Sequence, residues 1–214
     1  MSKPLQAAQE FAAVLKERRS VRHYDPTVKI SREEIKQMFE LALTAPSSSN
    51  MQPWRFLIID DQGLKEKLLP ISYNQQHVLE ASAVIAVLID MKFYEKASEI
   101  YHSTANLGVM SEELRDKMIQ SSLKLYGSLP EEALRRVGTF DAGLVSMQLM
   151  LAARSMGYDT VPMGGYNAEQ FKAAFDVPAT YEPALLIAVG KASEAGHPTS
   201  RLTFEEVTNW NSFN

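Results

Sequence analysis

The sequence predicts an α+β fold, in which a compact sheet of four or five strands is flanked by helices. Two observations support this class. Short apolar runs typical of strands are mixed with many helical segments, and the two kinds do not alternate in the regular way of a parallel α/β fold. No repeat, low-complexity block or linker divides the chain, so residues 1–214 are expected to form a single domain.

Two helical patterns precede the first strand. The first begins near Pro4, a residue suited to the first helical turn, and ends at a cluster of arginines at positions 18–22. The second follows Ser31 and Glu34, whose spacing is that of a capping box, and it stops before Pro46.

Four apolar runs are expected to be strands, the first of them buried and the second central. They cover residues 54–59, 83–89, 159–163 and 184–189. Short helices are expected after Asp60-Asp61, over residues 74–80 and after Asn167. Residues 91–128 look helical but uneven, and they fit either an excursion packed over a site or a plain helical hairpin.

The longest helix is expected from Pro130 to Gly157, a typical stop residue. Small side chains line one face of it, which fits either a central helix at a subunit interface or a crowded core helix in a monomer.

The tail at 192–214 has little periodicity but is apolar, so we expect it to wrap over the body or over a partner subunit. Its apolar residues are Leu202, Phe204, Val207, Trp210 and Phe213.

Composition excludes several classes of protein. A net charge of −4 argues against a nucleic-acid surface, and the absence of Cys rules out disulfides, thiolate metal sites and cysteine nucleophiles. The purest apolar run, residues 83–89, is far shorter than the roughly twenty residues of a membrane-spanning helix. The N-terminus has no apolar signal core. We therefore expect a cytoplasmic protein that contacts no membrane.

The segment Arg18, Arg19, Ser20 and Arg22 is the most informative part of the chain. Guanidinium groups repel one another, so crowding them is costly unless an anion lies among them, and their N–H donors match phosphate oxygens in pairs. The alternative is a solvated basic end of a helix. A second polar cluster, Pro-Ser-Ser-Ser-Asn-Met-Gln-Pro-Trp at 46–54, leads into the first strand.

The usual catalytic signatures are missing. The histidines at 23, 77, 102 and 197 lack the spacing of a zinc or iron site, and no nucleophile elbow, mononucleotide P-loop or Gly-x-Gly-x-x-Gly turn occurs. A chain without redox or nucleophilic groups, yet rich in anion and amide ligands, is expected to borrow its chemistry from a cofactor. That cofactor should carry a phosphate and a planar polar ring.

With these residues the chain resembles the FMN-dependent nitroreductases along almost its whole length. The matching landmarks stand in family order and at family spacing. They are residues 18–22, residues 45–56, Asn74 ahead of residues 79–82, residues 162–166, Val189-Gly190 and Arg201.

The resemblance implies a homodimer with a mostly antiparallel sheet, a C-terminal tail exchanged between subunits, and two interfacial FMN sites built from both chains. One subunit would bind FMN through Arg18, Arg19, Ser20, Arg22 and Arg201, and its twin through Pro46, Ser47, Ser48, Asn50 and Gln52. Asn74 would hydrogen-bond the pyrimidine ring, and it could also cap a helix. His77 stands where some members carry a basic residue near the flavin. Gly164 and Gly165 would pass beneath the ring, although a simple strand-end turn is the alternative for them.

The activity implied by the resemblance is that of an NAD(P)H-dependent oxidoreductase. NADH or NADPH would pass a hydride to FMN and leave, and a nitroaromatic, a quinone or a similar flat acceptor would follow at the same face in a ping-pong sequence. No side chain need be an essential acid or base. Two alternatives stay open: a flavin-binding or sensory module with little turnover, and another flavin reaction on this fold, such as dehalogenation, azole oxidation or flavin breakdown. Gly164 and Thr199 depart from the pattern of some branches, which leaves the acceptor and the hydride donor open.

Overall fold

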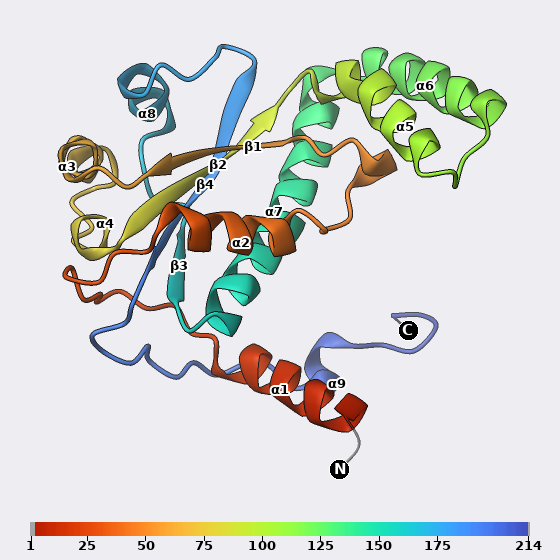
Figure 1. Ribbon diagram of the computed structural model, residues 1–214. Coiled ribbons are helices and arrows are strands. Elements are labelled where there is room, and N and C mark those ends of the chain that lie inside the picture. The colour runs from red at the N-terminus through yellow and green to blue at the C-terminus, as the bar shows by residue number, and fades with distance from the viewer. Residues whose placement is uncertain (1–2, 214) are drawn as a thin grey trace.

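Four strands form one antiparallel sheet in the computed structural model, which describes residues 3–213 (Figure 1). The order is β1-β2-β4-β3. The strands are β1 (Trp54–Ile59), β2 (Ala83–Asp90), β3 (Asp159–Met163) and β4 (Tyr181–Gly190). Each strand includes one of the expected apolar runs, and the predicted α+β class is confirmed.

The central and edge positions in the sheet differ in burial. Every residue of β2 is buried, because β2 pairs with β1 on one side and with β4 on the other. By contrast, β1 has a single neighbouring strand and only its two end residues are fully buried; Ile58 is 38% exposed. The prediction that 54–59 is a buried strand is therefore wrong, since a continuous apolar run does not reveal that a strand lies at an edge.

Helices cover both faces of the sheet. One face packs against α2 (Arg32–Ala42) and the long α7 (Glu131–Ser155). The other face packs against α3 (Gln62–Ile71), α4 (His77–Glu80) and α8 (Ala168–Ala174). The expected caps are confirmed at three helix starts, where side chains accept hydrogen bonds from backbone N–H groups. They are Ser31, Asp61 and Asn167.

The long helix α7 lies unusually close to β2. A Cβ atom added at Gly138 would lie 2.2 Å from Cγ2 of Ile89, so only a residue without a side chain fits there. The chain leaves α7 through Gly157, which has φ +83°, the left-handed conformation that glycine adopts most readily. The sequence expectation for this helix is thus confirmed to within two residues at either end.

Residues 91–128 form a helical hairpin that projects from the body (Figure 1). It consists of the short 3-10 helix η2 (Phe93–Lys96), α5 (Ala97–Asn106) and α6 (Glu112–Gly127). A separate hydrophobic cluster holds it to the body, with Met51 and Leu134 as the buried members from outside the hairpin. The expected helical hairpin is confirmed, and its packing over a site stays a prediction.

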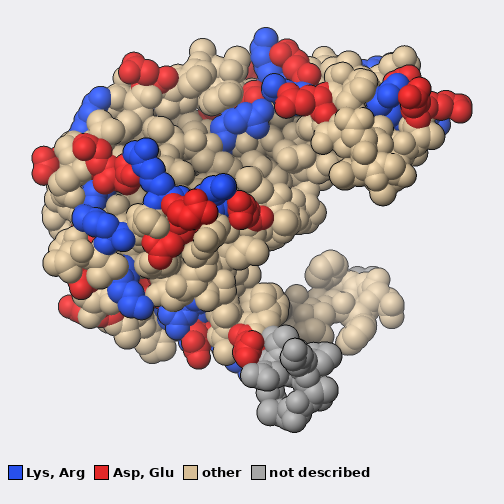
Figure 2. Space-filling model, in the orientation of Figure 1, with Lys and Arg blue, Asp and Glu red and all other residues tan. Residues whose placement is uncertain are grey.

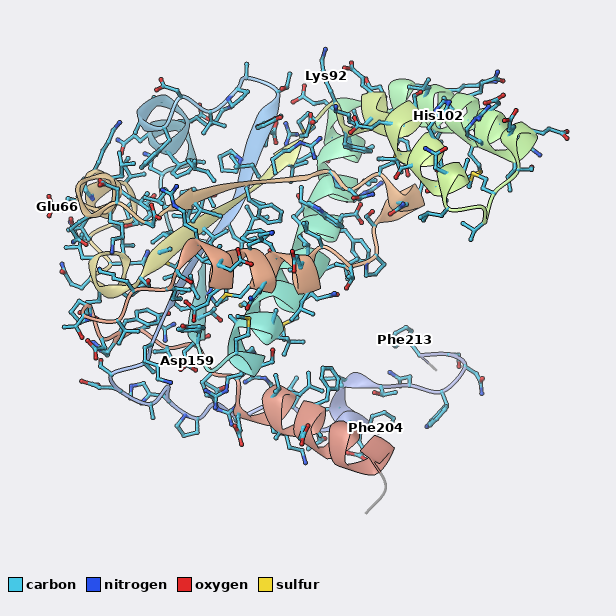
Figure 3. The ribbon with its side chains drawn as sticks, in the orientation of Figure 1. Glu66, Lys92, His102, Asp159, Phe204 and Phe213 are labelled. Carbon is cyan, nitrogen blue, oxygen red and sulfur yellow. The ribbon has the colours of Figure 1, made fainter. Side chains whose placement is uncertain are left out.

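The two ends of the chain lie together on one side of the molecule (Figure 1). There α1 (Lys3–Glu17) overlaps in this view with the tail, which contains the short α9 (Phe204–Val207). Figure 3 shows Phe204 and Phe213 on the tail, away from the sheet. Both side chains are exposed, at 59% and 93%. Among residues 3–213, no helix has both the length and the apolar character needed to cross a lipid bilayer.

Candidate functional site

The arginine segment at 18–22 lies along the outer edge of β3. Ser20 forms a parallel bridge with Thr160, and the N–H of Val21 donates to the carbonyl oxygen of Thr160 at 3.1 Å. The tail returns past the same place, because a Cβ atom at Gly196 would lie 2.6 Å from Cβ of Arg19. The segment that starts the chain and the segment that ends it therefore meet beside β3.

The expected phosphate ligands have no acidic partner. Among the described side chains, the guanidinium groups of Arg18 and Arg22 form no hydrogen bond or ion pair, and those of Arg19 and Arg201 donate only to neighbouring oxygens of the chain. Of the six arginines elsewhere, five are ion-paired within residues 3–213, namely Arg32, Arg55, Arg115, Arg135 and Arg154, and Arg136 is not. Guanidinium groups that lie in one region and lack an acidic partner are typical of a site that binds an anion.

Two further segments meet at the end of β3. The side-chain amide of Gln75 donates to the carbonyl oxygens of Gly165 at 2.8 Å and Ser72 at 2.9 Å. Nearby, Nε2 of His77 lies 2.8 Å from Sδ of Met163. These contacts bring together two segments that are far apart in the sequence, residues 74–77 and residues 163–165.

Asn74 does not cap a helix. Its φ is +59°, α4 begins only at His77, and Gln76 occupies the position before it. The expected helix over 74–80 is therefore wrong in its first turn. Left-handed backbone is open to asparagine more than to most residues with a side chain, which explains its presence in this turn. Its side chain is exposed and forms no hydrogen bond in the described structure.

His77 is a buried histidine whose pKa is lowered. Burial lowers the pKa of its imidazole below the ordinary value, and the positive charge of Arg22 lowers that pKa further. With one ring nitrogen against the thioether of Met163 and 6% of the residue exposed, His77 forms part of the wall beside Arg22.

Gly164 faces open space. A Cβ atom placed there would meet nothing within 4 Å, and one at Gly165 would come no closer than 4.0 Å to the amide of Gln75. Packing within this chain thus does not require glycine at 164. A ligand that lies against the backbone would require it, because a side chain would occupy the same space.

The other half of the expected site lies elsewhere. We call residues 47–52 the 47–52 loop; it contains the 3-10 turn η1 (Ser48–Asn50) and leads into β1. Trp54 pairs with Ile89 near the last residue of β2, whereas Thr160, next to the arginine segment, pairs with Val189, which in turn pairs with Ala83, the first residue of β2. The two halves therefore lie at opposite ends of the sheet and do not meet within one chain.

Asp141, on α7, holds the 47–52 loop from behind. Its carboxylate is fully buried and accepts hydrogen bonds from the N–H of Ser48 at 3.0 Å and from the hydroxyl of Ser48 at 3.1 Å. Burial raises the pKa of Asp141, and the hydrogen bonds from Ser48 oppose that rise. Neither Asp141 nor Gln75 was predicted from the sequence. The signal for Asp141 was a lone acid on a helix face otherwise made of small and apolar residues.

An apolar groove of about 620 Å³ runs between α1, α2 and α7. It begins beside the 47–52 loop, because Pro46 is part of its wall, and it follows α7 toward α1. Figure 2 shows this margin of the molecule as concave and largely free of charged side chains. The wall is formed by Phe11, Val14, Leu41, Thr44, Pro46, Gly143, Leu144, Met147, Gln148, Leu151, Ala152 and Ser155.

The described residues offer no metal centre, since no three His, Asp or Glu side chains between residues 3 and 213 are grouped closely enough to hold an ion.

Comparison with known proteins gives a consistent result. The model of the Nitroreductase family matches residues 15–191. Bacillus subtilis (strain 168) YdgI, provisionally named an NAD(P)H nitroreductase, is 45% identical over 203 residues, which cover 94% of this chain and 97% of that protein. The CLA biosynthesis enone reductase of Lactiplantibacillus plantarum is 32% identical over 90% of each chain. A crystal structure of a provisionally named nitroreductase in complex with FMN, from Exiguobacterium sibiricum 255-15, superposes with a TM-score of 0.90 at 46% identity. That match covers 94% of this chain and 96% of that one.

Proposed function

Because the chain belongs to the nitroreductase family, we propose that it is an FMN-dependent oxidoreductase, which takes electrons from NADH or NADPH and delivers them to a flat organic acceptor. The observation that carries the proposal is the group of unpaired guanidiniums beside an open glycine turn. A phosphorylated planar ring would supply an anion to the guanidinium groups and a flat surface to the glycine turn. On this proposal residues 1–214 act as one FMN-binding domain.

The residues fit FMN in two groups. Arg18, Arg19, Ser20 and Arg22, with Arg201 from the returning tail, would bind the phosphate, the ribityl chain and the pyrimidine edge. Asn74 would hydrogen-bond the pyrimidine, His77 would flank it, and Gly164 and Gly165 would leave room for the ring and offer a backbone N–H. Pro46, Ser47, Ser48, Asn50 and Gln52 would complete the site from a second chain.

FMN, when bound, supplies the redox chemistry, since its ring can accept a hydride and return electrons singly or in pairs. The protein's part is electrostatic and steric. Arg22 would supply a fixed positive charge that favours an anionic ring, and that charge, together with burial, lowers the pKa of the neighbouring His77. With Gly164 and Gly165 beneath one face of the ring, the opposite face would receive both substrates in turn, so ping-pong kinetics are expected.

We place the second half of the site on a second copy of this chain. The two halves lie at opposite ends of one sheet, so a single chain leaves each incomplete, whereas a two-fold dimer brings each against its complement. The apolar groove, with its small residue Gly143, is the surface on which two α7 helices would meet. The exposed tail from Leu202 to Phe213 would cross to the partner and lose its exposure there.

Nitroaromatics and quinones are the acceptors that we expect first. An activated alkene is the second candidate, because the enone reductase from Lactiplantibacillus plantarum is similar to this chain over 90% of the length of each protein. The two classes are separated by initial rates with a benzoquinone, a nitroaromatic and an α,β-unsaturated ketone under identical conditions.

We also propose a cytoplasmic location, because reduced nicotinamides are supplied there. Cell fractionation tests this proposal.

The decisive experiment is an absorbance spectrum of the purified protein, followed by anaerobic titration with NADH and with NADPH. We expect the bands of bound flavin, their bleaching by at least one nucleotide, and their return on addition of an acceptor. A flavin-loaded protein that consumes neither nucleotide would be a binding or sensory module. A colourless protein that takes up no added FMN would contradict the proposed site.

A further inference from the structure

The 47–52 loop has a backbone that needs support. Ser49, Asn50 and Gln52 have φ of +50°, +57° and +48°, in the left-handed region that residues with side chains rarely adopt. Three such residues within four positions persist only where surrounding contacts hold them. Within the loop, the hydroxyl of Ser47 accepts a hydrogen bond from the N–H of Gln52 at 3.0 Å.

Two of the supporting contacts come from the α5–α6 hairpin. The hydroxyl of Tyr101, on α5, donates to the carbonyl oxygen of Ser49 at 2.9 Å. The hydroxyl of Tyr126, on α6, donates to Oγ of Ser49 at 2.9 Å. Both tyrosines are buried, at 4% and 5% exposed, so neither hydroxyl can exchange its acceptor freely for water. One strained residue is thus held by both arms of the hairpin.

The docking of the hairpin in turn depends on the 47–52 loop. The buried residues that connect the hairpin cluster to the body are Met51, within the same loop, and Leu134, on α7. The hairpin projects from the body with the loop lying against its base (Figure 1). A change in the loop would therefore remove two hydrogen bonds and one of the few buried apolar contacts that dock the hairpin.

We propose that Tyr101 and Tyr126 are positioning residues that couple the docking of the α5–α6 hairpin to the affinity of the 47–52 loop for FMN. The inference rests on the proposed function, in which this loop binds FMN from the twin subunit. FMN that holds the loop in its strained form also holds the hairpin, and a docked hairpin preorganises the loop for FMN. By linkage the two effects are equal in size.

The test compares the wild type with Y101F, Y126F and Y101F/Y126F as FMN-loaded proteins. These substitutions remove two hydroxyls and keep the rings of the hydrophobic cluster. The matched control is Y94F, on the same hairpin, because the hydroxyl of Tyr94 forms no hydrogen bond in the described structure. The FMN dissociation constant is read from the flavin fluorescence that is released on dilution.

Each single variant is expected to raise the dissociation constant about threefold to tenfold, and the double variant to raise it further. Hydrogen exchange gives a readout beyond affinity: saturating FMN should slow the exchange of amides in α5 and α6 of the wild type and of Y94F, and slow it less in the double variant. If the double variant does not fold, S49A, which removes the acceptor of Tyr126, replaces it.

The outcomes separate the two proposals. A wild type that binds no FMN overturns the proposed site and the coupling with it. A wild type that binds FMN while the double variant matches Y94F in affinity and exchange overturns the coupling alone. A rise in the dissociation constant that Y94F shares equally overturns it as well, because the effect would then belong to the hairpin in general.

Discussion

At the scale of single residues, the most informative feature is a group of arginines that lack an acidic partner. Arg18 and Arg22 form no ion pair among the described residues, although Glu80 lies close enough to accept from the N–H of Tyr24 and to approach His23 at 3.7 Å. Guanidinium groups without an acidic partner are available to an anionic ligand.

Arg22→Ala is expected to weaken FMN binding about tenfold to a hundredfold and to slow flavin reduction, because it removes a charged hydrogen-bond donor and a fixed positive charge. Flavin fluorescence on dilution and stopped-flow reduction measure the two effects. Arg136→Ala is the control, since Arg136 is exposed and unpaired too but lies near the start of α7. Wild-type flavin content and rates in Arg22→Ala would refute the role.

At the scale of elements, local caps and close packing set where each helix lies. The capping box of α2 is extended by a residue from beyond α7: Glu34 accepts hydrogen bonds from the hydroxyls of Ser31 at 2.6 Å and of Tyr158 at 2.7 Å, and from the N–H of Ser31. One carboxylate thus caps α2 and ties it to the chain that follows α7.

Glu34 should make stability depend on acid pH. These hydrogen bonds lower the pKa of Glu34 from 4.5 to about 2. Because the folded pKa is below the unfolded value, the stabilisation is complete above pH 4.5 and is lost as the pH falls toward 2. Urea unfolding should show Glu34→Gln less stable than wild type at pH 7, with the gap closing between pH 4.5 and 2. Glu33→Gln, in the same helical turn, is the control; a pH-independent gap would refute the assignment.

Gly138→Ala tests how closely α7 approaches β2. The added methyl would lie 2.2 Å from Cγ2 of Ile89, so the helix must move or the side chain must adopt a strained rotamer. We expect a loss of about 1–3 kcal/mol in the free energy of unfolding. Gly127→Ala, on α6, meets its nearest side-chain atom at 3.8 Å and should be tolerated. Equal stability of the two variants would contradict the packing described.

At the scale of the whole molecule, one chain holds the two candidate segments apart and exposes an apolar groove. The arginine segment and the 47–52 loop lie at opposite ends of the sheet, and a groove of about 620 Å³ runs along α7 toward α1. Leu202, Phe204, Val207, Trp210 and Phe213 are each more than half exposed. Exposed apolar surface on this scale is typical of an interface, and we propose a second copy of the chain as the partner.

Met147→Lys tests assembly and cofactor binding together. Met147 is 39% exposed on the groove, where a lysine charge would be buried between subunits. Sedimentation should shift toward the monomer, and flavin absorbance per chain should fall in parallel. Leu64→Lys is the control, because Leu64 is exposed to a similar extent on α3, across the sheet from the groove. A monomer that keeps its full FMN content would refute the shared site.

Much of the fold could be predicted because its signals are local. Ser31, Asp61 and Asn167 cap helices through atoms within three residues of themselves, and each of the four apolar runs lies in a strand. Asn74 was misjudged because an asparagine before a helical pattern is typical of a cap, whereas here it takes a left-handed turn. The edge position of β1 was missed, since the neighbours of a strand are chosen by topology.

The sequence by itself determined most of the elements and the nitroreductase family, and it proposed the residue types of a phosphate site, because caps, hydrophobic periods and clustered charges act over a few residues. Only the tertiary structure decided that Gln75 meets Gly165, that Asp141 holds Ser48, and that two tyrosines hold Ser49. Those contacts join positions that are 52 to 93 residues apart, and which side chains meet across such separations depends on how the helices pack on the sheet.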